Sequence, residues 1–311
     1  MRHTQPKGVL FLLLAAFLWG SSFVAMSIGT ESLRAFSFST LRCLFALIFL
    51  VPAVAVQDVR NRKRMSEGER AAYVGAKHNA LLFGVPLGVC IFAGTNLQQI
   101  ALSYTSPGKV AFITALYMVF VPLVMLFFGK KSRALLWGAV ILGAVGLYLL
   151  SIGDEGFTAV NIGDVLSLFA ALAFTAQIVL VDRFAPKTDA LALCAVQFAV
   201  AGVLAAALML VFESPNDGDF VRALLPAAYV GVLASGVAYT LQIVGQARTD
   251  PTLATLAMCA ESVFAVLCAM VLLRQIPTAR EAAGIVLMLV AIVGAQFATK
   301  DKVSPDPKRN P

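Results

Sequence analysis

The sequence predicts an all-α integral membrane protein with ten transmembrane helices, arranged as two inverted five-helix repeats. Three observations lead to this fold class. The 311 residues are 59% hydrophobic and only 13% charged, whereas soluble domains are nearer half apolar and a quarter charged. The apolar residues gather in runs of 17 to 25 residues, the length at which a helix crosses a bilayer. The second half of the chain also resembles the first.

Each predicted span is a stretch with few or no charged residues. In chain order the spans are 8–28, 35–56, 79–102, 110–128, 134–152, 165–181, 190–212, 223–247, 252–273 and 282–298. An isolated span must satisfy its backbone hydrogen bonds internally, which favours helix, and no run alternates in polarity as a barrel strand would. The charged stretch 57–78 is predicted as the longest loop, with a short surface helix. The tail 299–311 is polar and Pro-rich, so we expect it to be disordered.

Basic residues are distributed unequally between the two sides of the predicted bundle. Of the 24 Lys and Arg residues, 18 lie in the termini and in the loops on the same side as the termini, and five lie in the opposite loops. Positive residues concentrate on the cytoplasmic side of a membrane, so both termini are predicted to be cytoplasmic. The net charge of +7 is therefore explained by the orientation of the protein in a lipid bilayer. The sequence has no basic stretch interleaved with aromatic residues, so it does not suggest nucleic-acid binding.

The two halves of the chain share polar and Pro positions in the same order. Four of these recur 144 residues later, as Gln98/Gln242, Thr105/Thr249, Pro107/Pro251 and Lys130/Arg274. The pattern predicts five-helix repeats at 8–152 and 162–298, although chance similarity between apolar helices is common. An odd number of spans inverts the second repeat relative to the first. Inverted repeats are typical of secondary transporters, whose substrate site lies near mid-membrane between them.

Five segments of the chain resemble an EamA-type permease of the drug/metabolite transporter superfamily. The segments AAFLWGSSFVAMSIG, FSFSTLRCLFAL and LQQIALSYTSPGKVAFITALYMVFVPL resemble the first half of such a permease, and GDVLSLFAALAFTAQIVLVDRFA and ARTDPTLATLAMCAESVFAVL resemble the second. Together they cover about 8–298. Two positions depart from the family's pattern: Ser262 stands where it has Pro, and Gln275 where it has Glu. The missing Pro suggests a straighter ninth span, and the missing carboxylate argues against ion coupling at position 275.

The resemblance implies a ten-helix secondary transporter that exports or exchanges small organic metabolites, such as amino acids, amines or drugs, by alternating access. It implies a multi-pass protein of a bacterial cytoplasmic (inner) membrane, with a small-molecule substrate and a proton as the candidate coupling ion. The alternative is a membrane-embedded enzyme or lipid-modifying protein, which would need His, Asp or Ser clustered on facing helices. The sequence shows no Walker A motif and no metal-ligand spacing around His3 or His78. We therefore expect no enzymatic activity, no cofactor and no metal.

Two charged residues fall within predicted spans. Glu261 lies near the middle of the ninth span, where a carboxylate costs at least about 2.5 kcal/mol and is usually functional or paired. It is a candidate for proton coupling or amine recognition, and the alternative is a neutral Glu hydrogen-bonded to a neighbouring helix. Arg42 lies about two turns into the second span. It is a candidate carboxylate-binding group, and the alternative is an anchor whose side chain extends to the outer interface.

Uncharged polar and aromatic residues complete the candidate substrate site. Amides and phenols both donate and accept hydrogen bonds, which suits polar or zwitterionic solutes, although the same groups also join helices to each other. Aromatic and hydroxyl groups near mid-membrane shape cavities for organic solutes, although a Trp on such a helix often serves packing. The candidates, with Glu261, are Trp19, Ser22, Asn96, Gln99, Tyr117, Gln177, Tyr239 and Gln242.

Overall fold

The computed structural model of the chain describes residues 6–105, 107–129, 134–152, 160–214, 216–272, 274 and 276–300. These residues are almost entirely helical, and none of them forms a strand. Within them, ten stretches of helix are long and apolar enough to cross a membrane. The protein is therefore an all-α, ten-span membrane protein, and the predicted fold class is confirmed. Residues 301–311, most of the predicted tail, lie outside the described residues.

The helices of the first half begin and end close to the predicted span limits, apart from one long extension. They are α1 (Pro6–Ser32), α2 (Ala35–Arg64), α3 (Glu67–Ala101), α4 (Pro107–Thr114), α5 (Tyr117–Phe127) and α6 (Ala134–Ser151). The short helices α4 and α5 together form the fourth span, which is interrupted at residues 115–116.

The second half follows the same order. Its helices are α7 (Ile162–Phe184), η1 (Ala185–Lys187), α8 (Ala190–Phe212), α9 (Asp217–Tyr229), η2 (Val230–Val237), α10 (Ala238–Gln246), α11 (Pro251–Leu272) and α12 (Ala279–Lys300). The eighth span consists of α9, η2 and α10, and η2 is a wider π-helical segment. π-Helical segments inside α-helices often occur at functional sites.

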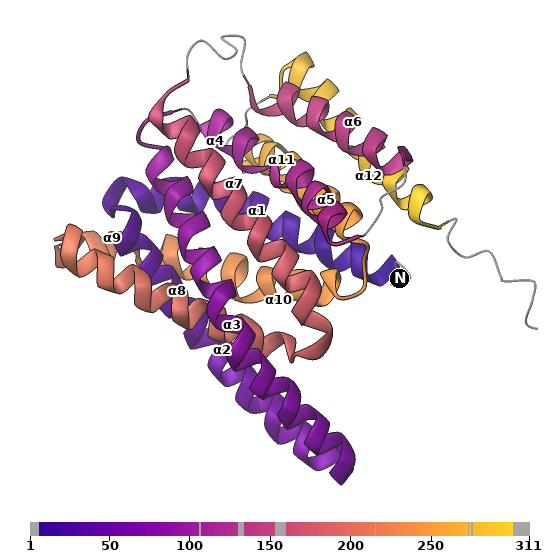
Figure 1. Cartoon of the computed structure of the whole chain (residues 1–311). Coiled ribbons are helices and arrows are strands. Elements are labelled where there is room, and N and C mark those ends of the chain that lie inside the picture. The colour runs from indigo at the N-terminus through magenta and orange to yellow at the C-terminus, as the bar shows by residue number, and fades with distance from the viewer. Residues whose placement is uncertain are drawn as a thin grey trace, which may run out of the picture.

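The predicted loop at 57–78 is wrong. Helices α2 and α3 continue through it, only residues 65–66 separate them, and the two helices extend together beyond the bundle as a hairpin (Figure 1). Ser66 and Glu69 form a reciprocal capping box at the start of α3, and Asp58 on α2 accepts hydrogen bonds from Tyr73 and Lys77 on α3. The fall in hydropathy after residue 56 marks the edge of the apolar run, and the charged residues that follow still form good helix.

Contacts between the helices repeat under exchange of the two halves. Helix α6 packs along α12 and α2 packs along α8, so each of these spans contacts its own counterpart. Helix α1 lies against α11, as its counterpart α7 lies against α4 and α5. Gly146 and Gly284 bring α6 and α12 into close contact, since a Cβ added to Gly284 would lie 2.7 Å from the Gly146 carbonyl oxygen. Small residues let membrane helices approach in this way.

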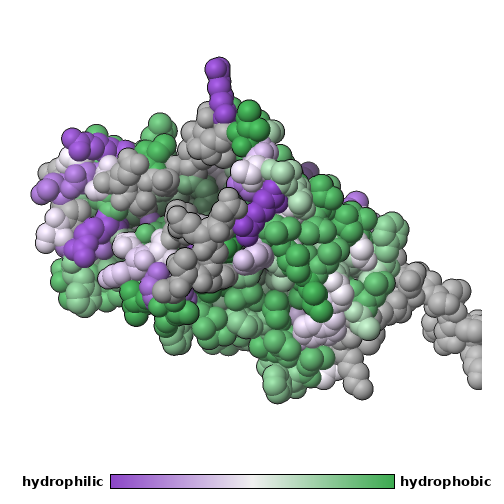
Figure 2. All heavy atoms as spheres, turned by 90° about the horizontal axis from the view of Figure 1, so that it is seen from above, coloured by the Kyte–Doolittle hydropathy of each residue, from purple (hydrophilic) through white to green (hydrophobic). Residues whose placement is uncertain are grey.

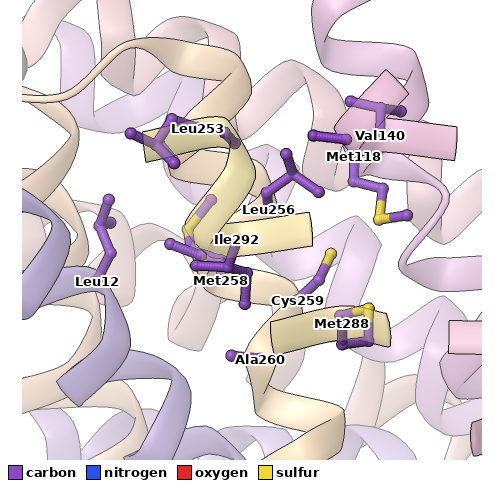
Figure 3. Close-up of a cluster of buried hydrophobic side chains, with 14 of the residues drawn as sticks. Leu12, Met118, Val140, Leu253, Leu256, Met258, Cys259, Ala260, Met288 and Ile292 are labelled. Carbon is purple, nitrogen blue, oxygen red and sulfur yellow. The ribbon is translucent and has the colours of Figure 1, made fainter. Parts of the chain in front are cut away.

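Helix α11 lies at the centre of the bundle and carries Glu261. Of its span, 61% is buried inside the protein. Figure 3 shows its apolar side chains surrounded by Leu12 of α1, Met118 of α5, and Met288 and Ile292 of α12. The outer faces of the other helices are apolar, and hydrophobic residues cover much of the visible surface in Figure 2. Helix packing on all sides of α11 therefore holds Glu261 inside the bundle.

Candidate functional site

A cavity lies between the two halves of the bundle, and side chains from both halves line it. Its accessible volume is about 80 Å³, several times what one water molecule needs. Eight of the ten residues singled out from the sequence line it: Trp19, Ser22, Arg42, Tyr117, Gln177, Tyr239, Gln242 and Glu261. Thr95, Gln98, Thr114 and Phe174 are further lining residues. We call this cavity the central pocket.

Trp19 joins α1 to the π-helical segment of the eighth span. Its indole Nε1 donates a hydrogen bond of 2.9 Å to the carbonyl oxygen of Ala234 in η2. Its ring meets that of Tyr239 edge-on, with centroids 5.1 Å apart, and Tyr239 in turn meets Phe198 at 5.2 Å. The edge-to-face geometry is favourable for aromatic pairs, so one wall of the central pocket is an aromatic cluster held by a backbone contact.

Arg42 reaches the central pocket because α2 packs closely on η2. A Cβ added to Gly231 would lie 2.5 Å from the backbone carbonyl oxygen of Arg42, so glycine is required at this crossing. The Arg42 Nε donates a 3.0 Å hydrogen bond to Ser235 Oγ in η2. The Arg42 residue is only 7% exposed. Its side chain is therefore enclosed between helices, which does not favour the alternative of an anchor that extends to the outer interface.

Glu261 lies on the central helix α11 and lines the same pocket. It is partly buried, and among the described residues no side chain donates a hydrogen bond to its carboxylate. Nor does it form an ion pair with Arg42, the other charged residue of the central pocket. An acidic and a basic side chain therefore line one cavity without forming an ion pair. The alternative of a Glu hydrogen-bonded to a neighbouring helix has no support in this geometry.

Two glutamines from the second half form a buried pair beside these charges. Gln242 Nε2 donates a 3.1 Å hydrogen bond to Gln177 Oε1. This leaves Gln177 Nε2 and Gln242 Oε1 without a partner, and Thr114 Oγ1 is also buried without one. If the O and N atoms of both side-chain amides were exchanged, Gln177 would donate to Gln242 instead, and one N–H donor group and one oxygen acceptor would still lack a partner. Buried polar groups are normally hydrogen-bonded, so the wall of the pocket has spare hydrogen-bonding capacity.

A second, wider cavity adjoins the central pocket and shares Phe23, Met26 and Gln98 with it. Its accessible volume is about 500 Å³, and it lies where α3 and α6 end and where α4 and α12 begin. With ten spans both chain ends lie on one side of the bundle, and the start of α1 and the end of α12 point the same way in Figure 1. The second cavity lies on the opposite side from these chain ends. We call this wider cavity the vestibule. Gln99 lines it.

The bundle is closely packed at the end nearer the chain termini. There a Cβ on Gly245 of α10 would lie 2.7 Å from Leu12 Cγ, and one on Gly8 would lie 2.5 Å from Thr249 Oγ1. Phe83 of α3 and Phe184 of α7 stack with ring centroids 3.9 Å apart. The central pocket thus adjoins open space on the vestibule side and tight helix packing on the other.

Two residues from the sequence analysis fall outside this arrangement. Asn96 is 4% exposed and lines neither cavity, and its Nδ2 donates to the carbonyl oxygen of Phe92 on its own helix. Gln275 lies outside the described residues. Helix α11 runs without interruption through Ser262.

The chain matches proteins of known family over most of its length. A family model described as the EamA-like transporter family matches residues 6–152 and 161–296. A relative from Archaeoglobus fulgidus, described as an uncharacterized transporter, is 28% identical over 287 residues, which cover 91% of this chain and 83% of that protein. A solved crystal structure superposes with a TM-score of 0.76 at 19% identity, covering 97% of this chain and all of the other. This last likeness supports the fold.

Proposed function

The chain belongs to the EamA-like transporter family, and from this premise we propose that it is a secondary transporter that moves small organic metabolites through the central pocket by alternating access. Membrane transport follows from the family, and the substrate, direction and mechanism are the proposal. The observation that carries it is a pocket between the two halves, lined by several polar and charged side chains in a mainly apolar wall, that adjoins a wide vestibule. Inverted-repeat transporters bind their substrates at this position.

The proposed orientation in the membrane follows from the loop charges. We place the chain termini in the cytoplasm of a bacterial cell, as the excess of Lys and Arg on their side indicates. The vestibule then faces outward, and the structure corresponds to an outward-open state. Rocking the halves to loosen the packing of Gly8 and Gly245 would open the pocket to the cytoplasm. Export or exchange of metabolites uses both states in turn.

The first test asks whether solute passes through the central pocket. The purified protein is reconstituted into liposomes, and counterflow of labelled amino acids, amines and organic acids is measured. Ser22→Phe places a large ring in the pocket, and we expect it to abolish counterflow while the protein still elutes as a folded species. Gly138→Phe is the matched control, because nothing lies within 4 Å of a Cβ at Gly138. Normal counterflow by Ser22→Phe would refute the proposed route.

The second test concerns coupling to protons. We propose Glu261 as the coupling carboxylate, because it is the one acidic side chain lining the central pocket within the described residues. A pH gradient should drive transport by the natural protein and should fail to drive it in Glu261→Gln. Glu67→Gln is the control, since Glu67 is exposed at the start of α3 and lines neither cavity. An unchanged response in Glu261→Gln would assign Glu261 a packing role.

A further inference from the structure

A surface groove runs along α2 where the α2–α3 hairpin leaves the bundle (Figure 1). Its described lining residues are all exposed, and they are Ala55, Val56, Val59, Arg60, Lys63 and Arg64. Positions 55, 59 and 63 are four apart, as are positions 56, 60 and 64, so all six lie on one face of the helix. We call this face the basic groove.

The basic groove changes from apolar to positive along its length. Val56 and Val59 are 68% and 56% exposed at the end nearer the bundle. Arg60, Lys63 and Arg64 follow toward the end of α2. A helix rises about 1.5 Å per residue, so the change takes place within about 12 Å. A ligand that fills the groove therefore has an apolar part joined directly to a negative one.

The three cations of the basic groove are not neutralised by the protein. Asp58 faces the other way, where it accepts a hydrogen bond from Lys77 of α3. The acidic residues in the first turn of α3 do not line the groove. Within the described part of the chain, Arg60, Lys63 and Arg64 form no ion pair. Three positive charges are therefore free to bind an anion from outside the protein.

The basic groove lies at the depth where a bilayer carries its phosphate groups. The apolar run of the second span ends at Val56, and the headgroup region beyond the hydrocarbon is roughly 5–8 Å thick on each side. At about 1.5 Å per residue, Arg60 is about 6 Å past Val56. Lys63 and Arg64 are further out, and their long side chains can extend back toward the interface. The loop between α2 and α3 is on the same side as the chain termini, because two spans precede it.

We propose that the basic groove binds an anionic glycerophospholipid of the cytoplasmic leaflet. The headgroup phosphate pairs with Arg60, Lys63 and Arg64, and one acyl chain lies along Val56 and Val59. The choice of leaflet rests on the orientation proposed above. Basic clusters just cytoplasmic of a membrane helix attract anionic lipids in this way.

Two other occupants fit the basic groove less well. A second copy of the chain, paired on this face, would bring six cations together. A water-soluble acidic partner could reach the cations, but Ala55 and Val56 belong to the apolar run of the span. A phospholipid is anionic at the headgroup and apolar below it, so it matches both ends of the groove.

The experiment measures lipid binding to the full-length protein in an uncharged detergent. Native mass spectrometry counts the lipids that remain bound while phosphatidylglycerol, or phosphatidylcholine with the same acyl chains, is titrated. We expect saturable binding of phosphatidylglycerol that is at least about 10-fold tighter than binding of phosphatidylcholine. Glycerol 3-phosphate, which has the phosphate but no acyl chain, should not bind in the same concentration range.

Variants assign the lipid to the basic groove. Replacing Arg60, Lys63 and Arg64 together by Gln should weaken binding of phosphatidylglycerol by about 5-fold per charge, or about 100-fold in all. Arg60→Lys combined with Arg64→Lys keeps the charges and should retain most of the affinity. Val59→Ser removes apolar surface and should weaken both lipids by about 4-fold.

A second triple variant is the matched control. Arg62→Gln, Arg183→Gln and Lys187→Gln remove the same charge from three exposed positions on the same side of the protein. None of these residues lines the basic groove. We expect this control to bind phosphatidylglycerol like the natural protein.

Four outcomes would overturn the lipid site. The groove triple variant could bind phosphatidylglycerol normally, or the two triple variants could lose it equally, which would indicate general surface charge. Phosphatidylcholine or glycerol 3-phosphate could bind as tightly as phosphatidylglycerol. The natural protein could form a dimer in lipid-free detergent that the groove triple variant abolishes, which would make this face an interface between copies. None of these measurements uses solute counterflow, so failure of the lipid site and failure of the transport function are distinguishable.

Discussion

The packing of α1 against α11 should control the geometry of the central pocket, and Gly20 is the residue that tests this. It follows Trp19 on α1 and faces the backbone of α11 at Glu261. A Cβ added to Gly20 would lie 2.6 Å from the Glu261 carbonyl oxygen and 2.8 Å from the amide nitrogen of Ala265. The obstacle is largely main chain, so no side-chain rotation can relieve it. Gly20→Ala must therefore move one helix relative to the other.

The size of that movement follows from the distances. Ordinary van der Waals contact begins near 3.4 Å, so α1 and α11 would have to separate by roughly 0.8 Å. Overpacking of this kind costs about 1–3 kcal/mol, which the better helix propensity of Ala offsets by about 1 kcal/mol. The same shift widens the pocket between Trp19 and Glu261. We expect a modest loss of stability and a larger loss of solute affinity.

The assay measures both quantities on the same preparations. Melting temperature in detergent reports stability, and KM for counterflow in liposomes reports affinity. Gly138→Ala and Gly294→Ala are the matched controls, because a Cβ at either position meets nothing within 4 Å, and both should melt at or slightly above the natural protein. A Gly20→Ala protein that melts and transports like these two would show that α1 and α11 are not in such close contact.

Three further substitutions test other parts of the structure. Glu213→Gln disrupts the three hydrogen bonds that the Glu213 carboxylate accepts at the start of α2. Because hydrogen bonds to a charged group contribute about 1.5–3 kcal/mol, we expect a lower melting temperature. An unchanged melting temperature would contradict the role of Glu213 as a cap of α2. Trp19→Phe leaves the Ala234 carbonyl without its indole donor, which should lower the free energy of unfolding by about 1 kcal/mol and raise KM. An unchanged KM would show that the contact between Trp19 and η2 does not affect solute binding. Asp58→Asn breaks the ion pair between Asp58 and Lys77, two side chains that are 26% and 27% exposed. Such pairs contribute about 0–1 kcal/mol to stability, and this pair lies outside both cavities, so KM should not change. A changed KM would show that the α2–α3 hairpin affects the central pocket.

The positions of the spans could be predicted from the sequence because lipid imposes a simple rule on composition. A helix in a bilayer must be apolar over its whole thickness, and ten such runs stand out between charged stretches. The α2–α3 hairpin could not be predicted by the same rule, because helices do not stop where the bilayer does. The S-x-x-E spacing of Ser66 and Glu69 is a start signal for a helix that the sequence itself carries. The contact between Asp58 and Lys77 is recognisable only once the two helices are known to be adjacent.

Residues of the pocket could be predicted by type but not by the face of the helix on which they lie. Trp19 and Ser22 are three residues apart, so both face the pocket. On α3 the pocket takes Thr95 and Gln98, also three apart, while Asn96 lies on another face of the helix. The sequence analysis favoured Asn96 because an amide both donates and accepts hydrogen bonds. Periodicity along α3 would have favoured Thr95, but the position of the pocket face depends on how α3 packs against α7 and α8.

The internal repeat bears on the role of Glu261 in a way that neither half shows alone. Gln98 and Gln242 are 144 residues apart, and both line the central pocket. At the same separation, Tyr117 in the first half corresponds to Glu261 in the second, and both again line it. The two halves thus share a framework in which one position holds a phenol in one copy and a carboxylate in the other. Because the first half packs with an uncharged residue there, the packing of the repeat does not itself demand a charge at 261. A carboxylate that the framework does not need, and that no described side chain pairs with, supports the proposal that Glu261 acts on what enters the pocket.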